Sequence, residues 1–156
     1  MTEHSHEHAN VIAPPPLIYG AFLLVGLLLH WASPRPFLSR AAGRLIGPAL
    51  SVIGFLIGLV AALTMRRAHT SLRPDTPTTA LVDTGPFRYT RNPIYVAFTL
   101  MYTGIACFVN TLWPILFLPF VLLIMDRGVI AREEQYLTHK FGPVYTQYKR
   151  QVRRWL

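Results

Sequence analysis

Four apolar blocks, each without a Lys or Arg residue, alternate with polar segments along the chain. They cover residues 17–32, 45–65, 93–109 and 112–125. A hydrocarbon core about 30 Å thick is crossed by roughly 20 helical residues, so the second block is long enough, whereas the last two must tilt or include flanking residues. The pattern predicts an all-α integral membrane protein of about four transmembrane helices.

Local signals predict where several of these helices begin and end. Proline is tolerated at a helix start, so the first helix should begin after the run that opens at Pro14 and end near Ser33. Asn92 is a suitable N-cap and Pro93 a suitable first residue for the third helix. Only a tight turn at Asn110 fits between the last two blocks, which predicts an antiparallel helical hairpin.

Small residues in the second block recur four or seven positions apart. The stripe consists of Gly47, Gly54, Gly58 and Ala62. Small residues let a neighbouring helix approach closely in a membrane. Packing within the chain is the favoured interpretation of this stripe, and a homodimer face is the alternative.

The charge distribution changes the picture by predicting an orientation. The chain is 52% hydrophobic and 14% charged, with a net charge of +8. Four spans place twelve of the fifteen basic residues on the side of both termini and three on the other, and basic loops remain cytosolic. We therefore expect a multi-pass protein of the cell (inner) membrane with cytosolic termini. Basic residues beside apolar spans need no nucleic acid to explain them.

This orientation divides a single membrane domain, residues 1–156, into five parts. They are a flexible tail (1–13), two transmembrane helices (14–65), a cytosolic loop (66–92), a transmembrane hairpin (93–125) and cytosolic or interfacial helices (126–156). The loop contains a short β-prone segment, residues 79–82. In the last part, five apolar positions with helical spacing predict an interfacial amphipathic helix: Val144, Tyr145, Tyr148, Val152 and Trp155. The sequence predicts no metal site, and the single Cys107 excludes an intrachain disulfide.

Two polar clusters flank the predicted hairpin. One precedes it, with Arg88, Tyr89, Arg91, Asn92 and Tyr95, and the other follows it, with Glu133, Glu134, Tyr145 and Tyr148. A hairpin brings its two ends together, so the clusters could form a pocket for a ligand that carries charges and a flat ring. A solvated rim of salt bridges around the helix ends is the alternative.

These clusters belong to a distinctive series of motifs: TGPFRYTRNPIY at 84–95, REEQYL at 132–137 and FGPVYTQY at 141–148. The series resembles the isoprenylcysteine carboxyl methyltransferase and phospholipid methyltransferase superfamily. In that family a Gly-x-x-x-x-x-Arg-His-Pro-x-Tyr segment precedes a helical hairpin, and a tail with Glu-Glu and paired tyrosines follows it. The resemblance covers residues 79–155, about half the chain.

The resemblance implies a methyltransferase site that binds S-adenosylmethionine. By position, the cofactor-binding residues are Thr79, Ala80, Leu81, Val82, Phe87, Asn92, Pro93, Ile94, Tyr95 and Glu133. The first four would contact the cofactor through their backbone, Phe87 would cover the adenine and Glu133 would bind a polar group. The candidate catalytic residues are Arg91, Glu133 and Glu134, and the candidate substrate-binding residues are Arg127 and Arg132.

Two departures from the family pattern bear on the acceptor. Asn92 replaces the usual His and cannot titrate near neutral pH, so a general base is not expected there. Val129 stands one helical turn before Glu133, where relatives acting on carboxyl substrates carry Arg, so a substrate carboxylate would lack its partner. We expect a hydrophobic, membrane-partitioned acceptor instead, such as a lipid amine, a thiol or an isoprenylcysteine-like group.

Two other functions remain open on the sequence. Membrane sterol reductases that use NADPH have a similar Arg-x-Pro-x-Tyr segment, although a Glu usually follows their Tyr closely, whereas Tyr95 is followed here by Val96 and Ala97. A non-catalytic membrane protein that retains the fold is the other alternative.

Overall fold

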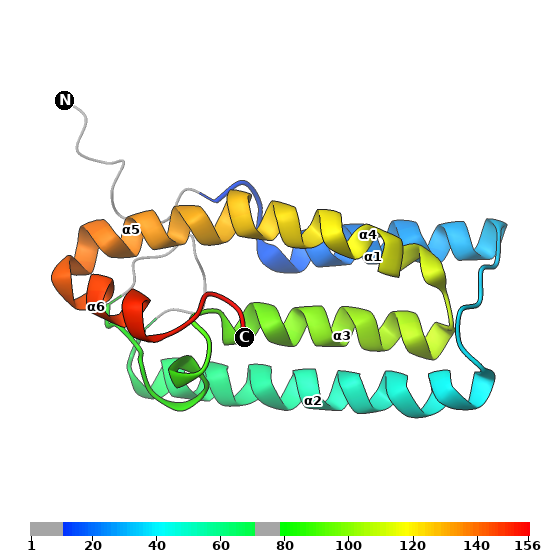
Figure 1. Ribbon diagram of the computed structural model, residues 1–156, viewed down its shortest axis with the longest axis horizontal. Coiled ribbons are helices and arrows are strands. Elements are labelled where there is room, and N and C mark those ends of the chain that lie inside the picture. The colour runs from blue at the N-terminus through cyan, green and yellow to red at the C-terminus, as the bar shows by residue number, and fades with distance from the viewer. Residues whose placement is uncertain (1–10, 71–78) are drawn as a thin grey trace.

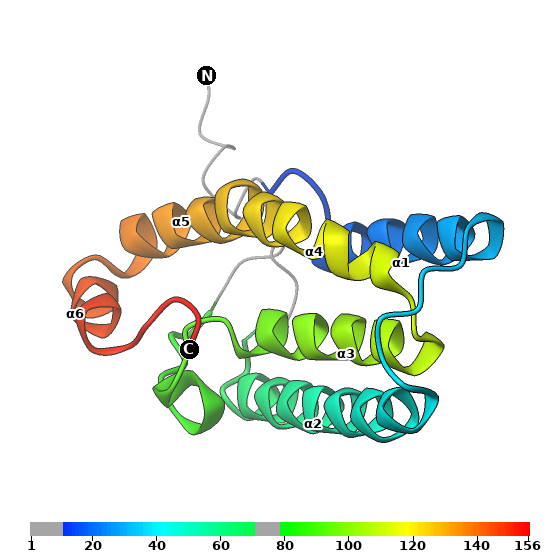
Figure 2. The ribbon, with the colours of Figure 1, turned by 45° about the vertical axis from the view of Figure 1, so that its right-hand side comes forward.

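The computed structural model describes residues 11–70 and 79–156, and within these ranges the protein is almost entirely helical. The long helices run side by side in two layers (Figures 1 and 2). One layer pairs α1 (Pro15–Ala32) with α4 (Leu112–Ile124), and the other pairs α2 (Arg40–Arg67) with α3 (Pro93–Val109). The prediction of an all-α membrane protein is confirmed.

The last apolar block does not end with α4. The chain continues through a π-helical stretch, η3 (Met125–Ile130), directly into α5 (Ala131–Phe141). Residues Leu112–Phe141 thus form one helical run, which in the described residues is long and apolar enough to cross a membrane, as are α1 and α2. α3, with 17 residues, is the shorter apolar helix. The fourth block is therefore less short than its sequence indicated, because flanking residues extend its helix.

Glycines bring α2 and α3 into close contact. A Cβ atom at Gly47 would lie 2.6 Å from the backbone nitrogen of Phe108, and one at Gly54 would lie 2.8 Å from the carbonyl oxygen of Ala97. Gly104 on α3 is packed just as tightly against Ser51. The small-residue stripe on α2 therefore serves packing within the chain, as predicted. Many larger apolar residues of α2, among them Leu45 and Phe55, are exposed, as expected of a helix facing lipid.

Asn110 joins the two layers at one end of the bundle. Its backbone is left-handed, with φ 57°, so it makes the tight turn of the predicted hairpin between α3 and α4. Its side chain accepts hydrogen bonds from the backbone nitrogens of Phe37 and Leu38 and donates one to the Leu38 carbonyl. Trp113 also donates to the carbonyl of Ser33. These bonds hold the α1–α2 connection against the hairpin turn.

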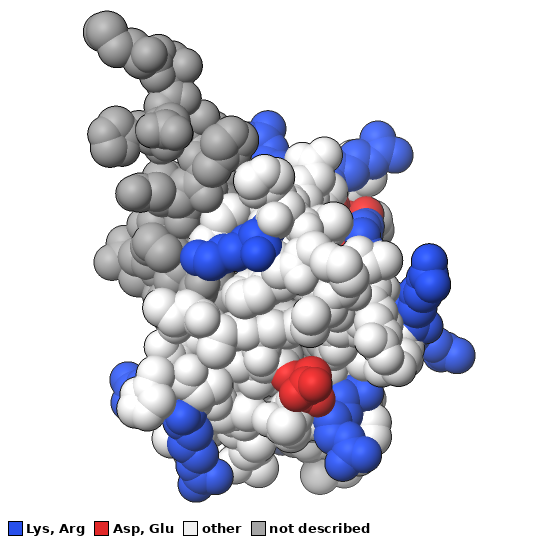
Figure 3. Space-filling view, turned by 90° about the vertical axis from the view of Figure 1, so that its left-hand side faces the viewer, with Lys and Arg blue, Asp and Glu red and all other residues white. Residues whose placement is uncertain are grey.

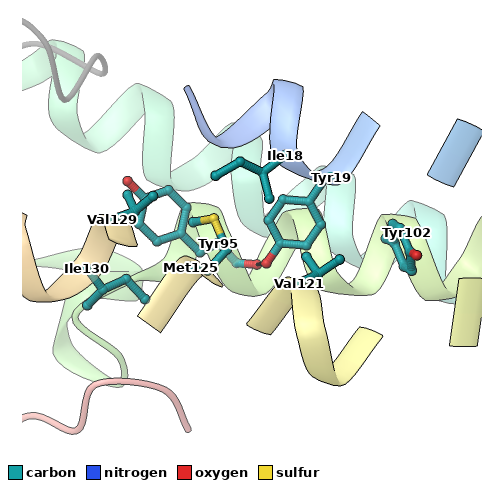
Figure 4. Close-up of a cluster of buried hydrophobic side chains, with 8 residues drawn as sticks. All are labelled: Ile18, Tyr19, Tyr95, Tyr102, Val121, Met125, Val129 and Ile130. Atoms are coloured by element: carbon teal, nitrogen blue, oxygen red, sulfur yellow. Dashed lines mark hydrogen bonds between the residues drawn. The ribbon is translucent and has the colours of Figure 1, made fainter. Parts of the chain in front are cut away.

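A cluster of buried side chains fills the space between the layers (Figure 4). It takes residues from α1, α3, α4 and η3: Ile18, Tyr19, Tyr95, Tyr102, Val121, Met125, Val129 and Ile130. The Tyr19 hydroxyl is 2.8 Å from Oγ1 of Thr99, which itself donates to the Tyr95 carbonyl. The cluster fixes α3 against η3 and so determines which residues meet at the end of the bundle opposite Asn110, called the site end below.

Three local expectations differ from the structure. Residues 79–82 are not a strand. α6 (Pro143–Gln151) ends before Val152, whose backbone is extended, so the predicted helical spacing does not reach Trp155. Asn92 stands at the N-cap position of α3 but its side chain does not cap the helix. The Asn92 side chain donates instead to the Arg154 carbonyl, because the segment after α6 turns back and hydrogen-bonds to residues 90–92.

The predicted N-terminal tail lies mostly outside the described residues, as do His4, His6 and His8. Residues 11–13 of this tail are described, and the backbone nitrogen of Ile12 donates a 3.3 Å hydrogen bond to the carbonyl of Gly128, on which its side chain packs. The start of the described chain is thereby attached to η3.

Candidate functional site

The start of α3 and the start of α5 meet at the site end. The hydroxyl of Tyr95 donates a 2.5 Å hydrogen bond to Oε1 of Glu133. Pro93 at the start of α3 and the continuous helix through η3 set the positions of these two residues. The structure therefore brings together the two polar clusters that flank the hairpin in the sequence.

Glu134 lies beside Glu133 and is the centre of a cluster of basic groups. Its side chain is only 7% exposed, and Oε1 lies 2.8 Å from Nη1 of Arg91. Arg154 donates to both carboxylate oxygens, with Nε at 3.1 Å and Nη2 at 2.6 Å, and Lys149 is 3.8 Å away. A buried carboxylate needs compensating charge, and here it has three cationic neighbours.

Arg154 binds a second carboxylate as well. Its Nη1 donates to both oxygens of Asp126 on η3, at 2.9 and 3.0 Å, and the indole of Trp155 donates to the same Asp126. Hydrogen bonds to Glu134 and then to Asp126 raise the pKa of Arg154 above its ordinary value, although burial opposes this rise. The guanidinium is thus charged and bridges η3 to α5.

The backbone after α6 completes this end of the molecule. Residues 152–156 form an extended segment, here named the C-terminal strap, which runs beside the segment before α3 (Figure 1). The Arg153 carbonyl accepts from the backbone nitrogen of Arg91, and the Arg154 carbonyl accepts from Nδ2 of Asn92 and Oγ1 of Thr90. The space between the two polar clusters, where the sequence predicts a ligand pocket, therefore contains the strap.

Two tyrosines of α6 face the same region. Tyr148 donates a 2.8 Å hydrogen bond to the carbonyl of Phe87, and the Tyr145 ring lies 6.0 Å from the Tyr148 ring. Burial raises the pKa of Tyr145 to about 12, with Glu134 adding to the rise and Arg91 partly offsetting it. Burial also raises the pKa of Tyr148. Both phenols therefore stay protonated at neutral pH and can act as hydrogen-bond donors.

The remaining predicted residues lie farther from this centre. Val82 and Phe87 pack on Ala61 at the end of α2, where Phe87 belongs to a short 3₁₀ helix, η2 (Gly85–Arg88). Thr79 is also attached to the end of α2, through hydrogen bonds with the His69 carbonyl and the Thr70 side chain. These residues form a wall on the α2 side of the site end.

The other predicted residues divide into two groups. Pro93 is fully buried and Ile94 packs against both apolar clusters, whereas Ala80 and Leu81 are partly exposed. The two predicted substrate-binding arginines, Arg127 and Arg132, are exposed. The structure thus gathers Arg91, Asn92, Tyr95, Glu133 and Glu134 at one place and leaves the other predicted residues at its edges.

Sequence reasoning did not identify three residues of this site. The sequence pattern places Arg154 on the basic face of an amphipathic helix, Asp126 at the start of the helical tail that leaves the membrane, and Thr90 in the loop. One signal in the sequence points to such partners. Glu133 and Glu134 are adjacent carboxylates in a helix predicted to lie near the membrane, and buried carboxylates require basic partners. In the described ranges no group of three or more His, Cys, Asp or Glu residues could hold a metal ion.

Comparison with known proteins gives two findings. The model of the phospholipid methyltransferase family matches residues 43–144 of this chain. An uncharacterized protein from Haemophilus influenzae is 54% identical over 35 residues, which are 22% of this chain and 56% of that relative. The second match is thus local and spans little more than half the relative's length.

Proposed function

The chain belongs to the phospholipid methyltransferase family, and from this premise we propose that it transfers a methyl group from S-adenosylmethionine to a hydrophobic acceptor held in the membrane. The observation that carries the proposal is the meeting of Tyr95 with Glu133 and of Arg91 with Glu134 at the site end. These pairs join the motifs before and after the hairpin, which are remote in the sequence.

The charge at the site end supports a cytosolic orientation for it. Lys and Arg side chains surround this end of the molecule, with few acidic side chains among them (Figure 3). Arg88, Lys149, Arg150 and Arg153 are all exposed there. Basic residues next to membrane spans favour the cytosolic side of the inner membrane, where S-adenosylmethionine is made available to enzymes.

The residues at the site end fit the chemical groups of this methyl donor. Its methionine part carries a carboxylate and an ammonium group, and its adenosine part carries a flat ring. Nη1 of Arg91 is paired with Glu134, but its Nε is buried with no acceptor in hydrogen-bonding geometry, so the guanidinium has a donor to offer a carboxylate. Glu133 offers a carboxylate to a cation. Tyr145, Tyr148 and Phe87 are buried aromatic side chains at the same end of the molecule.

In this proposal the protein chiefly binds and orients. Arg91 and Glu133 hold the charged end of the donor, Tyr95 fixes the Glu133 carboxylate, and the wall of Val82 and Phe87 faces its apolar parts. When bound, S-adenosylmethionine supplies a methyl group on a positively charged sulfur. Glu134 keeps Arg91 in position. The buried apolar cluster around Tyr95 closes the membrane-facing side of the site to water.

The surroundings of Glu133 support an amine or a thiol as the acceptor. Val129, one turn earlier, is 0% exposed within the core cluster, so this position offers no cation to a substrate carboxylate. Arg127 and Arg132 are exposed on the surface of the helix and do not replace it. A lipid amine or a thiol places no such demand on the protein.

Ligand-induced stabilisation tests the donor assignment. Purified protein in lipid nanodiscs should unfold at a higher temperature with S-adenosylhomocysteine and at an unchanged temperature with NADPH. Glu133→Gln should abolish most of the stabilisation, whereas Gln135→Ala, at an exposed position of the same helix, should retain it. Stabilisation by NADPH alone would support a reductase instead, and stabilisation by neither ligand would support a non-catalytic protein.

The acceptor is identified by transfer of a labelled methyl group. Nanodiscs containing the protein and radiolabelled S-adenosylmethionine are supplied in turn with lipid amines, long-chain thiols and prenylated cysteines. Label should enter the organic phase with an amine or a thiol. Label in a base-labile ester of prenylcysteine would show that the carboxyl group is methylated and would contradict the acceptor proposal.

A further inference from the structure

The C-terminal strap, residues 152–156, occupies the space between the two halves of the candidate site. Its backbone carbonyls at Arg153 and Arg154 accept hydrogen bonds from Arg91, Asn92 and Thr90, which precede α3. Its Arg154 side chain binds Glu134 on α5 and Asp126 on η3. The strap is therefore bonded to both polar clusters.

The strap contacts residues next to the groups that the proposed function assigns to the methyl donor: the backbone of Arg91, and Glu134 beside Glu133. Arg91 and Glu134 lie within 2.8 Å of each other, and Arg154 approaches Glu134 from the other side. Asn92 carries its side-chain hydrogen bond to the strap rather than to a ligand or to its own helix. If the donor lies between the two clusters, as the proposed function requires, a bound donor and a docked strap exclude each other.

The strap is held by hydrogen bonds and by packing of Trp155 against the core cluster, and the hydrogen bonds can be released. It has no helical structure of its own, and it follows α6, which ends at Gln151. Arg154 is 32% exposed, so water can reach part of its side chain. When Arg154 leaves, Glu134 keeps Arg91 at 2.8 Å and Lys149 at 3.8 Å as cationic neighbours. Opening the strap thus does not strand a buried carboxylate.

We propose that Arg154 is a gating residue: it latches the C-terminal strap over the donor site through Glu134 and Asp126, and the methyl donor binds only after this latch opens. This inference rests on the proposed function, because it names what the donor must displace. The apparent affinity for a ligand is the intrinsic affinity reduced by the fraction of molecules in the open state. Weakening the latch should therefore strengthen donor binding.

Calorimetric binding of S-adenosylhomocysteine to the full-length protein in nanodiscs tests this inference. Arg154→Ala should bind about tenfold more tightly than wild type, since it loses charge-assisted hydrogen bonds to two carboxylates and the open fraction rises. Arg150→Ala removes the same charge from an exposed position of α6 and should leave the affinity unchanged. An unchanged or weaker affinity in Arg154→Ala would overturn the latch.

A second measurement uses the wild-type chain alone. Trypsin cleaves after Arg153 and Arg154, and loss of the last residues is read by intact mass. S-adenosylhomocysteine should accelerate this cleavage, because it keeps the strap undocked, whereas cleavage slowed or unaffected by the ligand contradicts the proposal. If neither wild type nor Arg154→Ala binds the ligand, the donor assignment is wrong, and the proposal that Arg154 controls donor binding is wrong as well. If wild type binds and Arg154→Ala binds no tighter, only the latch is wrong.

Discussion

The hydroxyl of Tyr95 and the carboxylate of Glu133, separated by 38 positions in the chain, are joined by a 2.5 Å hydrogen bond. This bond crosses from the first helix of the hairpin to the helix that follows its second. It makes the orientation of Glu133 depend on the packing of α3 against η3, and so connects the membrane core to the site end.

Replacing Tyr95 by Phe should therefore weaken donor binding. Tyr95→Phe removes one hydrogen bond, which costs about 1 kcal/mol of stability, and leaves Glu133 without the group that orients it. We expect S-adenosylhomocysteine affinity to fall about tenfold by calorimetry. Tyr102→Phe is the matched control, since Tyr102 is a buried tyrosine of the same helix that donates to the Pro114 carbonyl. Equal losses of affinity in the two variants would contradict a specific role for Tyr95.

Neutralising Glu134 should destabilise the protein more than neutralising Asp126. Both carboxylates bind Arg154, but the Glu134 side chain is 7% exposed and that of Asp126 is 35% exposed. Glu134→Gln leaves Arg91 and Arg154 without their shared buried counterion and should cost about 3 kcal/mol, whereas Asp126→Asn should cost about 1 kcal/mol or less. Urea unfolding in detergent measures both. A larger loss of unfolding free energy in Asp126→Asn than in Glu134→Gln would show that burial does not determine how much each carboxylate stabilises the protein.

Adding a methyl group between α2 and α3 should destabilise the bundle. In Gly47→Ala the new Cβ would lie 2.6 Å from the Phe108 backbone nitrogen, which cannot move without shifting α3, so we expect a loss of about 2 kcal/mol or more. Gly20→Ala is the control, because a Cβ there has nothing within 4 Å. Thermal unfolding should show a lower midpoint for Gly47→Ala alone. Unchanged stability of Gly47→Ala would mean that the two helices are not in close contact.

Loss of the Asn110 side chain should loosen the end of the bundle opposite the site. Asn110→Ala removes three hydrogen bonds to Phe37 and Leu38. It also places alanine, whose Cβ is strained in the left-handed conformation, at φ 57°, so we expect the variant to lose about 3 kcal/mol of stability. Asn110→Gly removes the same bonds but suits the left-handed backbone, so it should cost about 1 kcal/mol less. Unfolding midpoints measure the difference. Donor affinity should remain at the wild-type value in both variants, since the site is at the other end.

The predictable part of the fold followed from local chemistry. The apolar blocks, the proline at the start of α3, the turn at Asn110 and the glycines of α2 depend on membrane thickness, backbone conformation and side-chain size, all of which can be evaluated from neighbouring residues. The same is true of the motifs around Arg91 and Glu133, whose position on either side of a hairpin implied that they meet. Their roles in binding and catalysis stay predictions.

Tertiary structure decided the rest. The π-helical stretch at Met125–Ile130 sets which face of α5 turns toward α3, and no spacing in the sequence announces it. Arg154 has an ordinary place in a basic tail, yet its extended backbone places it between Glu134 and Asp126. A charged side chain in a non-helical segment has no local constraint on its partner, so only the folded molecule, in which burial makes an unpaired carboxylate costly, determines where it binds.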